Sequence, residues 1–179
     1  MVAVIAASLH GGGARAQTRP DFSGTWTFDA ARSSVFGGGR GDPGARGQRT
    51  GPGGGQGGGT GLGAPAERLT IRQDADTLAI DQQFADRSIA LTYRLDGKPA
   101  ANTLMMGRGR AVPDAAYTST WRDSRLRTII RARLPGRGAT FDAEFEEVRY
   151  LDRDGRMVIE TSARRGFGGG SRRAVYNRM

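Results

Sequence analysis

Four carboxylates lie close together in this chain, at Asp142, Glu144, Glu146 and Glu147. Paired carboxylates can act as the general acid and the nucleophile or base of glycoside hydrolysis, provided that both face the same bond. The segment around them alternates apolar and polar residues in the manner of a β-strand. Asp142, Glu144 and Glu146 therefore share one face of that strand, and the neighbouring strand decides whether they are free to react.

That neighbouring strand carries arginines at the same spacing. If the turn lies at residues 135–138, Arg131 falls opposite Asp142 and Arg127 falls opposite Glu146. Opposite charges on facing strands form cross-strand pairs that stabilise a sheet by a few tenths to about 1 kcal/mol each. We therefore interpret the acidic run as an outward-facing ladder of ion pairs and not as a catalytic pair.

Histidine and cysteine chemistry is almost absent. The chain contains no cysteine, and its single histidine is His10. Without them in the mature chain, Ser-His-Asp and Cys-His mechanisms and the usual zinc or haem ligation are excluded. We predict a protein that is not an enzyme and has neither metal nor cofactor. An enzyme working through Asp, Glu, Tyr and Arg remains a lesser alternative.

The N-terminus predicts export. Residues 2–9 form a short apolar run, and Ala14-Arg15-Ala16 then supplies a small-x-small cleavage pattern. These features are typical of a signal peptide over residues 1–16, and the run is too short to span a bilayer. We expect a periplasmic or secreted protein whose single domain covers residues 17–179.

Charge and composition indicate the partners. The formal net charge is +9 and comes almost entirely from arginine, since Lys98 is the only lysine. For an exported protein, anionic lipid or polysaccharide surfaces are more plausible partners than nucleic acid. The Gly-rich stretch at about 35–64 has little to bury and predicts a disordered insertion within the domain.

The remainder alternates at period two, with turn signals between the runs. The strands expected from this pattern lie near residues 23–29, 67–73, 77–84, 87–95, 102–106, 116–122, 125–134, 139–150, 156–163 and 173–178. Successive hairpins keep apolar residues opposite one another, which indicates a meander. The predicted fold is all-β, an up-and-down antiparallel barrel of about eight to ten strands.

The register of each hairpin follows from the same matching of faces. The expected pairs are Ile71 with Leu78, Leu69 with Ile80, Leu78 with Tyr93, Ile80 with Leu91, Gln82 with Ile89, Trp121 with Leu126, Tyr117 with Ile130, Ala132 with Phe141, Ile130 with Ala143, Tyr150 with Met157, and Val148 with Ile159. In the strand near 139–150, Phe145 and Val148 are out of phase. An extra residue at Glu146-Glu147 would restore the phase, so we predict a β-bulge there.

The inward face of this barrel mixes aromatic and small residues. Its larger members, which are candidates to contact a ligand, are Tyr93, Tyr117, Trp121, Phe141 and Phe145. Smaller inward residues are Ser119, Thr128, Ala132, Ala143 and Thr161. Small barrels are either packed solid or hold one small ligand, and both outcomes stay open here.

Gly24-Thr25-Trp26 on the first strand resembles the Gly-x-Trp motif of the lipocalin-like, calycin-type barrels. The start of the domain is also similar to bacterial secreted proteins that begin with an FSGTW strand. The resemblance implies that Trp26 closes one end of the barrel against an arginine from a late strand, either Arg173 or Arg178. It departs from the family in the Gly-rich insertion after the first strand and in lacking the second, Thr-Asp-Tyr-like motif.

These observations favour non-catalytic binding of a small apolar or amphiphilic molecule inside the barrel. The alternative is a cell-envelope interaction protein with a solid barrel, whose Arg/Gly-rich loops contact anionic surfaces.

Overall fold

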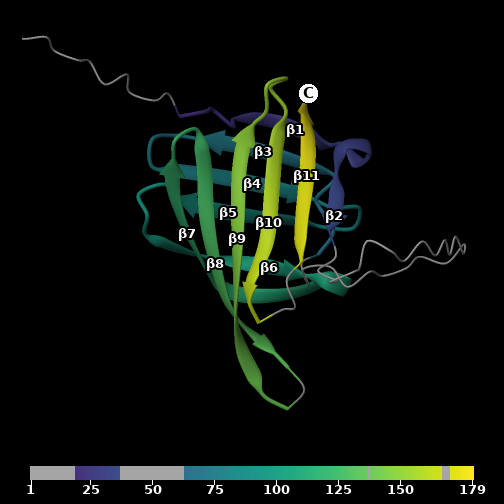
Figure 1. Cartoon of the computed structure of the whole chain (residues 1–179), viewed down its shortest axis with the longest axis vertical. Helices are drawn as coiled ribbons and strands as arrows, with labels where there is room; N and C mark the ends of the chain where they lie inside the picture. The colour runs from purple at the N-terminus through teal and green to yellow at the C-terminus, as the bar shows by residue number, and fades with distance from the viewer. Residues whose placement is uncertain (1–18, 37–62, 137, 167–169) are drawn as a thin grey trace, which may run out of the picture.

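A computed structural model describes residues 19–36, 63–136, 138–166 and 170–179 of the chain. The expected signal peptide at residues 1–16, and all of the Gly-rich insertion except its two ends, lie outside the described residues. The described chain folds as one antiparallel β-sheet that curls into a barrel (Figure 1).

Each expected segment corresponds to a strand of the sheet, because period-two alternation gives each strand one apolar and one polar face. The strand at residues 34–36 was not expected, and the strand expected at 116–122 begins already at Arg110. The strands are β1 (Gly24–Phe28), β2 (Ser34–Phe36), β3 (Arg68–Gln73), β4 (Thr77–Gln83), β5 (Ser88–Arg94), β6 (Pro99–Met106), β7 (Arg110–Arg122), β8 (Arg125–Pro135), β9 (Thr140–Leu151), β10 (Met157–Arg165) and β11 (Ser171–Arg178). Two short 3-10 turns, η1 (Ala30–Arg32) and η2 (Gly107–Gly109), complete the described elements.

The strand order is that of a meander. Ten strands follow the path β5-β4-β3-β1-β11-β10-β9-β8-β7-β6, and β2 pairs with β11 beside this path. The first strand, β1, lies between the last strand β11 and β3, so strands from the two ends of the described chain are neighbours in the sheet. The prediction of an all-β, up-and-down barrel is confirmed.

The barrel closes between β5 and β6 by a side chain. No backbone ladder joins these two strands within the described chain. Instead the Thr92 N–H donates to Oδ1 of Asn102 at 2.8 Å, and the Asn102 Nδ2 donates to the Thr92 carbonyl at 2.8 Å. The Asn102 amide thus reproduces one rung of a ladder, at a point where the register between β6 and β7 shifts.

Two hairpins have the predicted register, since Leu78 pairs with Tyr93 and Trp121 pairs with Leu126. Two others are displaced by two residues, an offset that keeps each residue on its predicted face. Ile71 faces Ile80 and not Leu78, and Ala132 faces Ala143 and not Phe141. The Asp74 N–H donates to the Thr77 carbonyl and the Gly136 N–H donates to the Ala139 carbonyl, so each turn is centred one residue further along the chain than predicted. A turn moved by one residue displaces the pairing by two.

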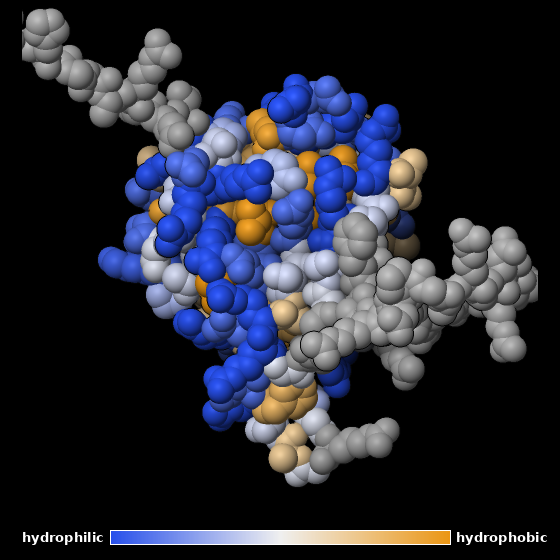
Figure 2. Space-filling model, in the orientation of Figure 1, coloured by the Kyte–Doolittle hydropathy of each residue, from blue (hydrophilic) through white to orange (hydrophobic). Residues whose placement is uncertain are grey.

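The displacement also changes the outer ladder of charges. The predicted pairing of Arg131 with Asp142 is wrong. Arg131 pairs with Glu144 at 2.9 Å, and Asp142 pairs with Arg133 at 3.3 Å. Arg127 and Glu146 do form the predicted ion pair. The carboxylates of the acidic run that face outward are therefore paired with arginines, and the face shown in Figure 2 is mostly hydrophilic.

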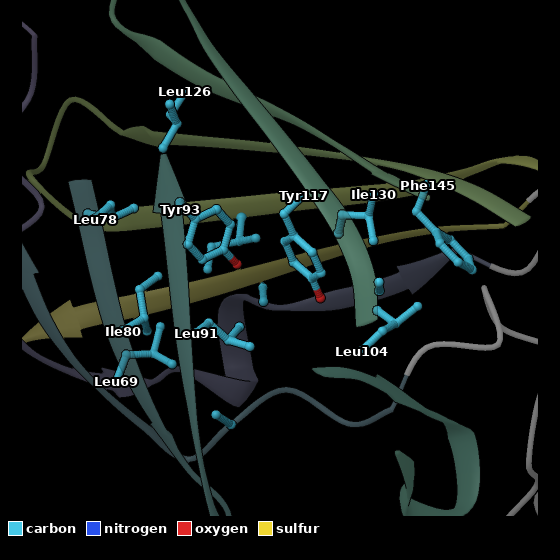
Figure 3. Packing of buried hydrophobic residues seen from close by; sticks show 14 of the residues in the cluster. Leu69, Leu78, Ile80, Leu91, Tyr93, Leu104, Tyr117, Leu126, Ile130 and Phe145 are labelled. Atoms are coloured by element: carbon cyan, nitrogen blue, oxygen red, sulfur yellow. The ribbon is translucent and has the colours of Figure 1, made fainter. Parts of the chain in front are cut away.

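Aliphatic side chains fill most of the interior. Leu69, Leu78 and Ile80 lie at one side of the view in Figure 3, and Leu104, Ile130 and Phe145 lie at the other side. All six are at most 4% exposed, which is the burial expected of a close-packed core.

Candidate functional site

Strand β9 places a glutamate and an arginine inside the barrel. The predicted bulge at Glu146-Glu147 is wrong, because β9 pairs without interruption with both neighbours through these residues, and the irregularity of its pairing with β10 lies at Ala163/Arg165. The strand therefore stays in phase, and Glu147 and Arg149 continue the inward face that begins at Ala143 and Phe145.

The turn between β9 and β10 explains why no bulge is needed to keep β9 in phase. The Asp152 N–H donates to the Arg156 carbonyl and the Gly155 N–H to the Asp152 carbonyl, which makes the turn longer than predicted. Tyr150 consequently pairs with Val158 and not with Met157. A shift of one residue exchanges the faces of a strand, so Val148 faces Glu160 and Arg149 faces Ile159.

Five neighbouring strands each contribute one polar residue to a row across the inner face of the sheet. The backbone register aligns, from β7 to β11, the residues Ser119, Thr128, Glu147, Thr161 and Arg172. We call these five residues the polar row. The hydroxyls of Ser119 and Thr128 are 2.8 Å apart and buried, so this part of the row satisfies itself.

Glu147 is paired within the interior. The Arg149 Nη2 donates to Oε1 of Glu147 at 2.9 Å, and the Arg149 side chain is only 1% exposed. The Arg149 guanidinium also lies 5.0 Å from the centre of the Tyr93 ring. Burial opposes the charge of Arg149, but the Glu147 carboxylate raises its pKa above the ordinary value. Within the described chain, Nε and Nη1 of Arg149 have no hydrogen-bond partner.

Arg172, at the end of the row, forms no direct ion pair within the described residues, although the charge of Glu147 acts on it. Its Nη1 donates to the Gly63 carbonyl, and its buried Nε has no partner among the described residues. No carboxylate of the described ranges lies within 4.0 Å of it, and burial lowers the pKa of its guanidinium. The next residue, Arg173, faces outward, where it donates to the Arg32 carbonyl at 3.0 Å and lies 3.9 Å from Glu160.

A cavity of about 70 Å³ lies between the polar row and one end of the barrel. Its polar lining includes Glu147, Thr161 and Arg172 together with the tyrosines Tyr93, Tyr117 and Tyr176. Its apolar lining includes Phe84, Leu91, Leu104, Met105 and Ile130.

Two tyrosines form one wall of this cavity. The rings of Tyr93 and Tyr117 meet edge to face, with centres 5.5 Å apart and planes at 87°. Figure 3 shows them side by side within the barrel, with their hydroxyls pointing the same way. Burial raises the pKa of both hydroxyls and raises that of Tyr176 to about 12, so all three are neutral hydrogen-bonding groups at physiological pH.

The cavity is bounded by residues 63–66, which we call the strap. The Gly63 N–H donates to the Met105 carbonyl on β6 at 3.0 Å, and Arg172 on β11 donates to the Gly63 carbonyl, so the strap joins two distant strands. A second, open hollow of about 360 Å³ lies against the strap and shares Gly63, Pro65, Phe84 and Met105 with the cavity. The strap is therefore a thin wall between the interior and this hollow.

The other end of the barrel is filled by the chain before β1. Phe22 is fully buried, and its ring stacks on Trp121 with centres 5.9 Å apart. The Trp26 Nε1 donates to the Phe22 carbonyl at 2.8 Å. This segment crosses the upper end of the barrel in Figure 1. The Arg178 guanidinium lies 4.6 Å from the centre of the Trp26 ring, so of the two candidate arginines it is Arg178 that contacts Trp26.

The candidate ligand-contacting residues are thus distributed over the barrel. Tyr93 and Tyr117 line the cavity, whereas Trp121 lies against Phe22 at the filled end. Phe145 is buried in the core opposite Ile130, and Phe141 is opposite Leu134 where β8 and β9 extend beyond the barrel. Gly24 has a φ of 122°, a backbone conformation that favours glycine at the start of β1.

Sequence reasoning missed Glu147, Arg149 and Arg172. The available signal was the uninterrupted alternation of β9 itself, which places Glu147 and Arg149 on the face of Phe145 if no bulge is inserted. The apolar Val148 and the aromatic Tyr150 favour the opposite phase, which is why the sequence predicts a bulge before them.

The sequence matches no protein-family model and no curated protein. The fold of the described residues defines the class, an antiparallel β-barrel made of one sheet with a polar cavity. Among the described residues, no helix is long and apolar enough to cross a membrane. Within the same ranges, no group of three His, Asp or Glu side chains is placed to hold a metal ion.

Proposed function

We propose that this protein is an exported, non-catalytic barrel that binds a small amphiphilic molecule in its interior. The observation that carries the proposal is a cavity with unsatisfied hydrogen-bond donors in a barrel that is otherwise close-packed. Buried polar groups are normally paired, and unpaired ones cost free energy unless water or a ligand satisfies them. Thr161 Oγ1 and Arg172 Nε are such groups at this cavity.

The lining suits an amphiphile. Leu91, Leu104 and Ile130 would remove an alkyl or ring group from water, at about 25 cal/mol per Å² of apolar surface buried. The tyrosine hydroxyls and the polar row would orient its polar end. Typical sites have this combination of an apolar lining and a few placed polar groups.

Size limits the ligand. A cavity of about 70 Å³ holds a few water molecules, whereas sites for drug-sized ligands measure roughly 300–1,000 Å³. The ligand is therefore small, or only its polar end lies in the cavity while the rest passes the strap into the adjoining hollow of about 360 Å³.

Native mass spectrometry of protein purified from its own host's envelope tests the proposal. We expect a small molecule that is retained by the wild type and lost from Tyr117→Ala, which opens the cavity wall. Tyr150→Ala is the matched control, because the Tyr150 hydroxyl bonds Glu160 outside the barrel. Repeated recovery of ligand-free protein from the host, with no small amphiphile binding in titrations, would contradict interior binding.

A further inference from the structure

We propose that the bound molecule carries a single carboxylate, and that this carboxylate is held by Arg172 and Thr161. The inference rests on the proposed interior binding and adds the chemical class of the ligand and the two residues that recognise it.

The first argument is the charge of the interior. Glu147 and Arg149 compensate each other at 2.9 Å, but Arg172 has no carboxylate within 4.0 Å in the described part of the chain. An arginine stays protonated even when burial lowers its pKa. Glu147 acts on this charge without forming an ion pair with it. A largely buried charge without a direct ion-pair partner is costly, and a ligand anion would supply that partner.

The second argument is the position of two unsatisfied polar atoms. Thr161 on β10 and Arg172 on β11 are directly paired in the backbone register, and both line the cavity. The Thr161 Oγ1 and the Arg172 Nε are buried without partners among the described residues. A carboxylate can accept from a hydroxyl with one oxygen and from a guanidinium N–H with the other, and such charge-assisted bonds are about twice as strong as neutral ones.

The third argument separates a carboxylate from other polar groups. A monoanion brings the group formed by Glu147, Arg149 and Arg172 to neutrality. A phosphate monoester with two charges would leave an excess negative charge beside Glu147, which lines the same cavity. A cation would face Arg172 and be repelled.

Isothermal titration of the full chain with four probes of equal chain length tests this class. The probes are octanoate, octanol, octyl phosphate and octylammonium. We expect octanoate to bind roughly tenfold or more tightly than octanol, because a hydrogen bond to a charged group contributes about that factor. Octyl phosphate and octylammonium should bind more weakly than octanoate.

Three variants assign the residues. Arg172→Gln should reduce octanoate affinity by roughly tenfold or more and change octanol affinity by less than about threefold. Arg173→Gln, one residue further on the outer face, is the matched control and should change neither. Thr161→Val removes only the hydroxyl and should weaken octanoate binding by a smaller factor, without affecting octanol. Because it leaves no new unpaired group, Thr161→Val also serves if Arg172→Gln fails to fold.

The outcomes distinguish this inference from the function on which it rests. Equal affinity for octanoate and octanol, unchanged in Arg172→Gln and Thr161→Val, would overturn the carboxylate site and leave interior binding standing. If none of the four probes binds and the protein from its host carries no ligand, interior binding itself fails.

Discussion

The Glu147 carboxylate accepts a hydrogen bond from Arg149 at 2.9 Å, and both side chains belong to the inner face of β9. The preceding residue, Glu146, lies on the outer face and pairs with Arg127, which holds the pKa of Glu146 below its ordinary value. Two consecutive carboxylates thus occupy two different dielectric environments, each with its own arginine.

Because Glu147 is paired inside the barrel and Glu146 outside it, removing the two charges should lower the free energy of unfolding by different amounts. Glu147→Gln leaves the Arg149 guanidinium buried without a counterion, and breaking a buried pair from one side costs about 3 to 5 kcal/mol. Glu146→Gln affects a half-exposed pair and should cost less than about 1 kcal/mol. Urea unfolding followed by circular dichroism measures both. Equal losses in the two variants would mean that Glu147 is not paired inside the barrel.

The buried tyrosines predict a loss of stability at alkaline pH. Burial raises the pKa of Tyr176 from 10.0 to about 12, so the folded state keeps a proton that the unfolded chain loses above pH 10. The stabilising contribution is complete below pH 10 and decreases as pH rises to 12, by about 1.4 kcal/mol per pH unit for each such tyrosine.

Tyr93 and Tyr117 should add to this slope, since burial raises the pKa of both. The free energy of unfolding, measured at several pH values from 9 to 12, should fall less steeply in Tyr176→Phe than in the wild type. An identical slope would show that Tyr176 ionises normally in the folded protein.

The seam between β5 and β6 predicts a local effect of Asn102. Asn102→Ala removes both hydrogen bonds to Thr92, so the backbone N–H and carbonyl of Thr92 lose these partners. This loss should lower the free energy of unfolding by about 1 to 3 kcal/mol. Hydrogen exchange of the Thr92 amide should accelerate strongly, while amides in β8 and β9 change little. As a control, Asn177→Ala removes an exposed contact with Asp29 and should leave the Thr92 exchange rate unchanged.

The filled end predicts a spectroscopic change. Phe22→Ala removes a fully buried ring that stacks on Trp121, at a cost of about 3 to 5 kcal/mol. Trp121 and Trp26 then gain access to water, so tryptophan emission should shift to longer wavelength in the folded variant. Arg19→Ala, whose guanidinium lies 5.7 Å from the Trp121 ring, should cost about 1 kcal/mol or less and leave the emission nearly unchanged.

The sequence predicted which residues form strands because alternation is a local property. It also predicted the register of β4 with β5, where Leu78 faces Tyr93 across a short turn. Matching of faces distinguishes odd from even offsets only, so it could not detect the displacement by two residues that pairs Ile71 with Ile80.

The site was harder to predict for a different reason. Glu147 and Arg149 contradict the rule that charged residues face water, and their burial is possible only because each compensates the other. Arg172 was visible as an arginine on the last strand, but its inward direction depends on the pairing of Thr161 with Arg172, which no local pattern specifies. Similarly, no motif marks Asn102 as the residue that closes the barrel.

Because, among the described residues, only the Asn102 side chain bridges β5 and β6 by hydrogen bonds, the barrel can widen most easily between these two strands. Separating β5 from β6 at this point breaks the two Asn102 hydrogen bonds, whereas separating any other neighbouring pair on the sheet path breaks a run of backbone bonds. Breathing motions of the wall should therefore concentrate at this seam. Leu91 on β5 and Leu104 on β6, which flank it, both line the cavity, so a widened seam offers an incoming molecule a side entrance.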